Sequence, residues 1–237
     1  MAMPGAAYIN PTTFGDLTGI NKWIWIISHV VADSKFITIF SILFGASVIL
    51  LTGKSEKAGT RPAGLHYRRN FWLLIFGLIH AYSIWYGDIL TVYAVCSFLL
   101  FLFRKVSVKG LIIWGLTFFS IGSILYLLFG FTLPFMPEEG RQELLMTWMP
   151  ETEKIAYEIE QYTGTWKERM AIRVPDVLVM HTTVFFTLYF WRVMGSMLLG
   201  MALFKSGFLS GQMNTRVYTR MLVIGLTLGT ALVVYGV

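Results

Sequence analysis

Long apolar runs dominate this chain and limit the folds that it can adopt. Only 14% of its residues are charged, whereas soluble domains carry about 25%. A helix needs about 20 apolar residues to cross the hydrocarbon core of a bilayer. Six runs approach that length, at roughly 36–53, 70–86, 88–103, 110–134, 177–204 and 221–237. The sequence therefore predicts an all-α fold, a polytopic transmembrane bundle of about six spans, with 1–237 as a single domain in the lipid bilayer.

A seventh apolar stretch, WIWIISHVVA at 23–32, is too short to cross the bilayer. Its Trp23 and Trp25 are typical of membrane interfaces, where an amphipathic ring meets both lipid and water. We therefore expect a separate short helix that lies in the interface or dips into it.

The charges of the connections predict how the chain is oriented. Three connections are basic, namely 53–69, 104–109 and 205–220. Basic loops stay on the cytoplasmic side of a membrane. We therefore expect the first 22 residues, the 86–88 turn and the acidic 135–176 segment outside. The net charge of +6 arises mainly in short loops and does not indicate a nucleic-acid partner.

The 135–176 segment mixes charged residues with leucine, methionine, tryptophan, isoleucine and tyrosine. Such a mixture is typical of amphipathic helices on a membrane surface. We expect two short helices separated by Pro150, which together form an extracytoplasmic amphipathic segment. A solvated connector with some helix is the alternative.

His80 is the titratable residue that lies deepest in the second run. An ionisable group at the bilayer centre costs about 3 kcal/mol unless it faces a cavity or a partner. Arg69 opens the same run, eleven residues earlier, which is about three helical turns and about 16 Å along one face. An extended anionic ligand such as an acyl-coenzyme A would fit this stripe, with its phosphates at the arginine. Alternatively, Arg69 contacts lipid phosphate and His80 packs between helices through a hydrogen bond.

Asp88 follows His80 by eight residues and begins the next run. A carboxylate at that position suits a helix N-terminus and is explained by capping alone. If the hairpin folds inward, however, the same carboxylate would orient the His80 ring.

Arg192 lies 13 residues before Lys205, too deep to reach the inner surface easily. We expect it to face the bundle interior or a cytoplasm-facing cavity, where it pairs with a protein acceptor or binds a ligand phosphate. His29 lies near the outer boundary and is either an interface residue or an acceptor-side group. The four histidines show no metal-binding spacing, so no metal cofactor is predicted.

Four ordered blocks carry a family resemblance: KFITIFSILFGASVILL, RRNFWLLIFGLIHAYSIWYGDILTVYAVCSFLL, YTGTWKERMAIRV and WRVMGSMLLGMALFKSGFL. They resemble the YeiB-like family of bacterial inner-membrane proteins, whose defining domain has no assigned function. Members of that family carry further helices at both ends. The resemblance therefore implies a multi-pass inner-membrane protein, and it implies that this chain is a fragment without the first and last helices.

The basic helix followed by the GDIL-headed helix is also similar, more distantly, to transmembrane acyltransferases of the heparan-glucosaminide N-acetyltransferase kind. That resemblance implies acyl-coenzyme A as the donor substrate and Arg69 as the arginine that opens the donor helix. It leaves the catalytic histidine open between His80 and His29.

We therefore expect a membrane-bound O- or N-acyltransferase that moves an acyl group from the cytoplasm to an unidentified small-molecule acceptor outside. His80 would be the base or the acyl carrier, Asp88 would orient it, and Arg68, Arg69 and Arg192 would hold the donor phosphates. A transporter of a small anionic solute is the alternative, and a structural membrane subunit is a third interpretation. The sequence is compatible with an oligomer.

Overall fold

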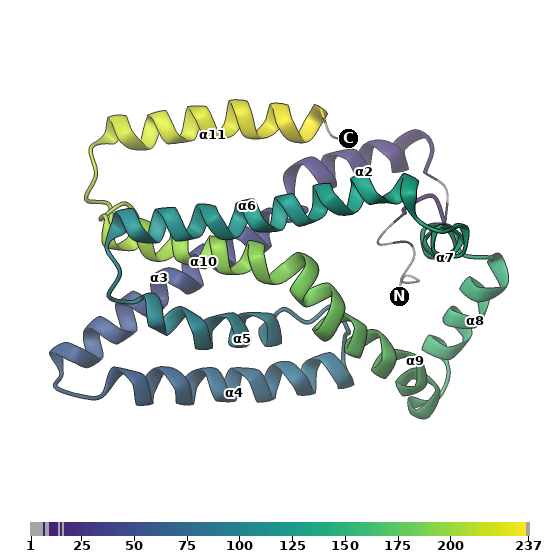
Figure 1. Ribbon diagram of the computed structural model, residues 1–237, viewed down its shortest axis with the longest axis horizontal. Helices are drawn as coiled ribbons and strands as arrows, with labels where there is room; N and C mark the ends of the chain where they lie inside the picture. The colour runs from purple at the N-terminus through teal and green to yellow at the C-terminus, as the bar shows by residue number, and fades with distance from the viewer. Residues whose placement is uncertain (1–6, 8–9, 14, 16, 236–237) are drawn as a thin grey trace.

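The computed structural model describes residues 7, 10–13, 15 and 17–235 of the chain, and every regular element in this part is helical, with no strand. The predicted all-α class is confirmed. The helices, labelled in Figure 1, are α2 (Gly19–Val31), α3 (Lys35–Lys57), α4 (Pro62–Ser83), α5 (Leu90–Leu100), α6 (Val108–Thr132), α7 (Glu138–Trp148), α8 (Thr152–Thr163), α9 (Trp166–Val179), α10 (Phe190–Lys205) and α11 (Thr215–Tyr235). A π-helix, η3 (Met180–Tyr189), joins α9 to α10, and short 3-10 turns follow α5 and α6.

Four helical stretches in the described residues are long and apolar enough to cross a membrane: Gly19–Lys57, Val108–Phe135, Trp166–Lys205 and Thr215–Tyr235. They contain four of the six predicted runs, although the last two residues of 221–237 lie outside the described part, as do several of the first 22 residues. The runs 70–86 and 88–103 do not qualify, so a count of six spans is not confirmed.

The physical reasons differ for the two remaining runs. The first third of α4 is polar, with His66, Arg68, Arg69 and Asn70. The helix in the run 88–103, which is α5 with its 3-10 turn, covers only Leu90–Phe103. At about 1.5 Å per residue this helix is shorter than the hydrocarbon core. The two instead form an antiparallel hairpin that packs against the bundle, below α3 and α10 in Figure 1.

Helix α10 is the centre of the bundle, and its most extensive contacts are with α3 and α6. Glycines allow these close approaches. A Cβ atom at Gly200 would overlap the backbone of Ile42, and one at Gly45 would overlap the backbone of Met197. Toward α6, a Cβ atom at Gly195 would lie 2.9 Å from the carbonyl oxygen of Gly115. The α10 glycines thus bring three helix backbones together, as small residues do in membrane bundles.

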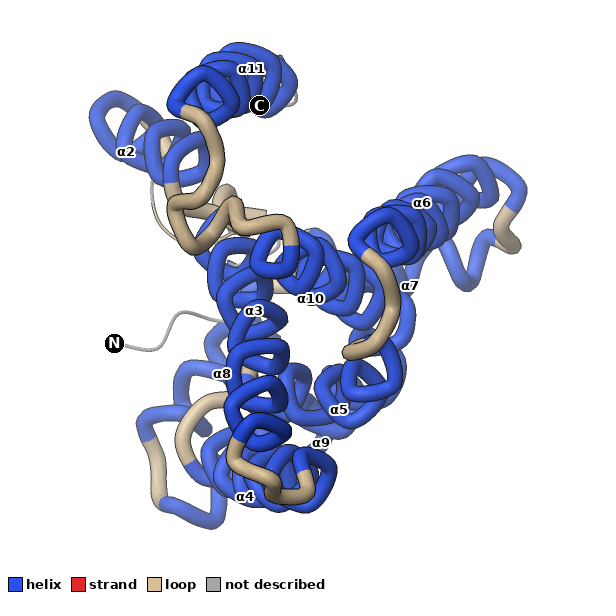
Figure 2. The backbone as a smooth tube through the Cα atoms, turned by 90° about the vertical axis from the view of Figure 1, so that its left-hand side faces the viewer, coloured by secondary structure: helices blue, strands red, loops and turns tan. Residues whose placement is uncertain are grey.

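The core around this junction is apolar and fully buried. Leu100, Leu111, Met194, Met197 and Met201 are its largest members. Cys96 is a free thiol that is also buried there. By contrast, α11 has no buried residue. Seen along the bundle in Figure 2, α11 and α2 lie together on one side, away from α6.

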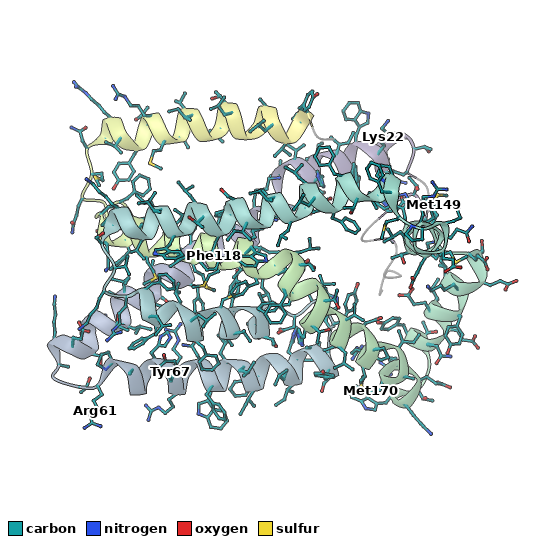
Figure 3. The ribbon with its side chains drawn as sticks, viewed as in Figure 1. Lys22, Arg61, Tyr67, Phe118, Met149 and Met170 are labelled. Atoms are coloured by element: carbon teal, nitrogen blue, oxygen red, sulfur yellow. The ribbon has the colours of Figure 1, made fainter. Side chains whose placement is uncertain are left out.

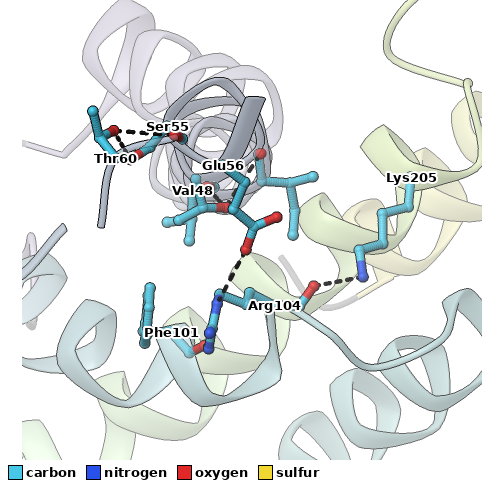
Figure 4. A network of polar contacts seen from close by, with 9 residues as sticks. Val48, Ser55, Glu56, Thr60, Phe101, Arg104 and Lys205 are labelled. Carbon is cyan, nitrogen blue, oxygen red and sulfur yellow. Dashed lines mark hydrogen bonds and ion pairs between the residues drawn. The ribbon is translucent and has the colours of Figure 1, made fainter. Parts of the chain in front are cut away.

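The three basic connections lie at one end of the molecule, at the left of Figure 1. Polar contacts join them, as Figure 4 shows. Lys205 Nζ donates to the carbonyl oxygens of Arg104 (2.6 Å) and Val106 (2.8 Å). Arg104 lies 3.9 Å from a Glu56 carboxylate oxygen. The common placement of these loops is what the orientation prediction requires.

The opposite end is built by α7, α8 and α9. Figure 3 shows Met149 and Met170 there, with Arg61 at the basic end. Helix α7 ends at Trp148, close to the break predicted at Pro150. The rest of the 135–176 segment forms two helices, α8 and the start of α9, where one helix was predicted. Gly164 ends α8, and Thr165 begins α9 with a capping box in which its side chain and Glu168 bond each other's backbone N–H groups.

Candidate functional site

His80 and Asp88 meet where α4 turns into α5. Nδ1 of His80 lies 2.9 Å from Oδ1 of Asp88. The Asp88 side chain is 1% exposed, whereas that of His80 is 33% exposed, so the ring remains reachable from outside the protein. The contact that the sequence allowed for an inward-folding hairpin is therefore present, and it leaves Nε2 of the ring available for chemistry.

The local fold holds the Asp88 carboxylate rigidly. Its second oxygen, Oδ2, accepts a 2.7 Å hydrogen bond from the backbone N–H of Thr91 in the first turn of α5. This bond satisfies a free N–H at the helix start. Asp88 thus does both things that the sequence suggested, because one oxygen caps α5 and the other orients His80.

Gly77 makes this arrangement possible. It lies one helical turn before His80, and a Cβ atom there would lie 2.6 Å from the backbone nitrogen of Thr91. Only a residue without a side chain lets α5 begin so close to α4. The glycine therefore sets the separation across which His80 reaches Asp88.

Two further residues near this pair were not predicted as site residues. His181, in η3, lies within electrostatic range of Asp88 and makes an edge contact with Tyr82. Its Nε2 is buried and has no hydrogen-bond partner among the described residues, and the same holds for Thr91 Oγ1. Unpaired buried polar atoms of this kind mark places where water or a ligand binds. The sequence offered no spacing that ties residue 181 to residue 88.

Arg173 closes the site from the side of α9. It is buried, and its Nη1 donates a 2.6 Å hydrogen bond to the carbonyl oxygen of Ser83 at the end of α4. In the same helix, Asp176 accepts a hydrogen bond from the Tyr162 hydroxyl of α8. Burial, followed by the nearby carboxylates of Asp176 and Glu158, raises the pKa of Tyr162 to about 12. Helix α9 thus packs beside the His80 turn, and α8 packs against α9.

The predicted donor arginines lie toward the basic end of the molecule. The Arg69 guanidinium lies 5.4 Å from the centre of the Phe44 ring, a cation–π contact. Arg68 is exposed. His66, which falls within the predicted 53–69 connection, lies inside α4 and is buried, with Nε2 2.9 Å from the Ser97 carbonyl oxygen. It is therefore a packing residue between α4 and α5.

Arg192 does not join Arg69. It lies near the start of α10, and its Nη2 donates to the Ser34 carbonyl oxygen (3.0 Å) and to Thr38 Oγ1 (3.2 Å). Phe44, which contacts Arg69, lies ten residues beyond Ser34 along α3, or about 15 Å. Arg192 thus pairs with a protein carbonyl at the start of α3, which is one of the two roles predicted for it.

The structure places His29 with Arg192 instead. Both line a pocket of about 520 Å³ at the junction of α2 and α3. His29 Nδ1 lies 2.9 Å from Asp33 Oδ2, so a second histidine–aspartate pair exists there. The side chains of both residues are exposed, that of His29 at 40% and that of Asp33 at 59%. Within the part of the chain that the structure describes, no group of three or more His, Cys, Asp or Glu residues could hold a metal ion.

These features define an all-helical protein of the membrane, with a histidine–aspartate pair beside one end of its bundle. Over 95% of its length the chain is 30% identical to the uncharacterised protein YeiB of Escherichia coli (strain K12), and the alignment covers 56% of YeiB. Over 62% of its length it is 39% identical to the uncharacterised protein YxaH of Bacillus subtilis (strain 168), covering 35% of YxaH. These homologues support a YeiB-like relationship.

The chain spans about half the length of YeiB and about a third of YxaH. No model of a known protein family matches it, and no solved structure matches it significantly.

Proposed function

We propose that the protein is a YeiB-like transmembrane acyltransferase of the bacterial inner membrane. It would transfer an acyl group from cytoplasmic acyl-coenzyme A to a small-molecule acceptor outside. One observation carries the proposal, namely the 2.9 Å contact between His80 Nδ1 and a buried Asp88 carboxylate that is itself fixed by Thr91. A histidine oriented in this way, with its other nitrogen reachable, is suited to proton transfer.

The chemistry would run through Nε2 of His80. This nitrogen accepts the proton of an acceptor hydroxyl or amine as that atom attacks the thioester carbonyl of the donor. The carbon–sulfur bond then breaks, and the proton passes to the departing coenzyme A thiolate. Asp88 stabilises the imidazolium that forms between these two steps. The acyl group ends on the acceptor, and the histidine returns to its neutral form.

The donor phosphates would bind toward the basic end of α4. Arg69 and the exposed Arg68 supply two guanidinium groups there, and arginine binds phosphate through paired hydrogen bonds. The eleven residues between Arg69 and His80 correspond to about 16 Å of helix, which suits an extended donor. Arg192 has no part in this donor site, because it contacts the opposite end of α3.

Donor binding can be tested by calorimetry on the full-length protein in detergent with acetyl-coenzyme A. We expect binding to the wild type and about tenfold weaker binding to Arg69→Ala, since losing a charge-assisted hydrogen bond costs at least about 1.4 kcal/mol. The exposed Lys57→Ala is the matched control. No binding to a well-folded wild type would overturn the proposal.

A second function has support from the helix geometry. Transporters bind their solutes where membrane helices are broken, and two long apolar stretches are interrupted here. The α2–α3 stretch breaks at Ser34, which has a φ of 63°, and η3 inserts a π-helix into Trp166–Lys205. Under this alternative, His80 relays protons for a small anionic solute. Proton-coupled uptake into vesicles that disappears in His80→Ala, without coenzyme A binding, would favour it.

A further inference from the structure

The pocket at the α2–α3 junction carries an inference that does not depend on acyl transfer. It lies between the break that separates these two helices, the start of α10 and the end of α11. Its ionisable residues are His29, Asp33, Lys35 and Arg192, and Ser34 and Thr38 are its other polar residues. Helices α11 and α2 lie next to each other on the same side of the bundle (Figures 1 and 2), and the pocket is lined from these two helices together with α3 and α10.

Both cations in the pocket keep hydrogen-bond donors for a ligand. Among the described residues, Arg192 donates to protein acceptors through Nη2 alone. Its Nη1 and Nε therefore remain available to donate to a ligand. Lys35 Nζ donates one hydrogen bond, of 2.9 Å, to the His29 carbonyl oxygen, and an ammonium group has three donors. The protein therefore fixes both groups in place without using all their donors.

The charge balance of the pocket favours an anion. Arg192 and Lys35 contribute two positive charges against the single carboxylate of Asp33, which leaves one net positive charge when His29 is neutral. His29 holds that carboxylate at 2.9 Å and stacks on Trp25, with ring centres 5.2 Å apart. In addition, Lys35 is the first residue of α3, whose N-terminus has a partial positive charge. A ligand with one negative charge would complete the site.

The remaining walls are apolar. Ile39 of α3 and Leu232 of α11 line the pocket and are themselves exposed. Both belong to stretches that are long and apolar enough to cross a membrane. A free phosphate ion would leave these walls in contact with water, whereas a hydrocarbon chain would cover them and gain about 25 cal/mol per Å² of apolar surface buried.

We propose that this pocket binds the phosphate headgroup of an anionic lipid, with Arg192 and Lys35 at the phosphate and the acyl chains along Ile39 and Leu232. Helix α11 has no buried residue of its own. A lipid in this pocket would contact α11 as well as α3 and α10, and would thereby link α11 to the rest of the bundle. Lipid would thus be a structural ligand at this junction.

Native mass spectrometry of the full-length protein, after extraction from vesicles of equal parts phosphatidylglycerol and phosphatidylcholine, tests this proposal. We expect one phosphatidylglycerol retained per chain in preference to phosphatidylcholine. Arg192→Gln and Lys35→Gln should each lower this retention about tenfold, because each removes a charge-assisted contact. Lys22→Gln, an equal change of charge on exposed α2 outside the pocket, should leave retention unchanged.

Three results would overturn the proposal: equal retention of the two lipids, an equal loss in Lys22→Gln, or unchanged retention in Lys35→Gln. If Arg192→Gln does not fold, Lys35→Gln decides the matter, because within the described part of the chain the Lys35 ammonium bonds a backbone carbonyl and no side chain. A separate arm adds inorganic phosphate. Displacement of the lipid at millimolar phosphate would show that the site binds a free anion, which contradicts the lipid assignment.

Discussion

Arg173 of α9 donates a 2.6 Å hydrogen bond to the carbonyl oxygen of Ser83, ninety residues earlier in the chain. This bond connects the acidic segment to the end of the helix that carries His80. Because the guanidinium is buried and the carbonyl belongs to a helix C-terminus with few other partners, the contact positions α9 beside the candidate site.

We expect Arg173→Ala to lower the free energy of unfolding by about 1.5–3 kcal/mol, the range for a hydrogen bond to a charged group. Chemical denaturation in detergent micelles would measure it. Lys167→Ala, on the exposed face of the same helix, should change the value by less than about 0.5 kcal/mol. If both variants lose the same stability, the Ser83 contact has no special role.

Gly77→Ala should separate α4 from α5. The added methyl group would lie 2.6 Å from the Thr91 nitrogen and 2.7 Å from its hydroxyl oxygen, so the start of α5 must move. We expect a loss of about 1–3 kcal/mol, as for other overpacked sites. Gly64→Ala in the same helix meets nothing within 4 Å and should be neutral or slightly stabilising. A neutral Gly77→Ala would show that the hairpin adapts easily.

Asp88→Asn tests the orientation of His80. The amide can still accept the Thr91 N–H, but it no longer supplies the negative charge beside the ring. If the protein transfers acyl groups, we expect kcat to fall by about 10²- to 10⁴-fold. Calorimetric binding of acetyl-coenzyme A should be unchanged, because the donor phosphates would bind near Arg69. Equal losses in binding and turnover would indicate a folding defect instead.

The raised pKa of Tyr162 should make the free energy of unfolding depend on pH in the alkaline range. Its pKa rises from 10.0 to about 12 on folding, so the folded state retains the phenolic proton after the unfolded state has lost it. Stability therefore decreases as the pH rises from about 10 towards 12. In Tyr162→Phe this part of the decrease should be absent. Unfolding midpoints of both proteins across that range would show it, and parallel curves would contradict the assignment.

Introduced cysteines test the orientation. The native thiol, Cys96, is buried, so labelling of intact cells should report only the new sites. Lys57→Cys, beside the basic connection, should react with membrane-permeant reagents alone. Glu153→Cys, on α8, should also react with an impermeant reagent from outside. The reverse pattern would invert the predicted topology.

The sequence left the His80–Asp88 pair open as an alternative to capping, because a tight turn between two helices brings residues on both sides of it together. It could also have revealed the start of α9, since Thr165 and Glu168 have the spacing of a capping box. For Arg192 the sequence left two roles open, pairing with a protein acceptor and binding a ligand phosphate. Which acceptor it meets depends on how α10 packs on α3, and that tertiary contact leaves no local signal.

His181 illustrates the same limit. It lies in a π-helix, whose extra residue per turn changes which side chains face the bundle. A periodicity of 3.6 residues therefore does not hold along this segment. Two of the predicted runs, 70–86 and 88–103, do not qualify as spans by length and composition. Apolar composition shows that a segment avoids water, but it does not distinguish burial against neighbouring helices from exposure to lipid.

The glycine contacts of α10 also restrict how this protein can move. Where the backbones of Gly200 and Ile42 touch, and again at Gly45 and Met197, no side chain lies between α3 and α10 to rearrange. Sliding these helices past each other would drive carbonyl oxygens into Cα atoms within a fraction of a turn. The pair is therefore a rigid frame. Any larger opening of the protein must come from elements outside this frame, by a swing of the α4–α5 hairpin or a departure of α11.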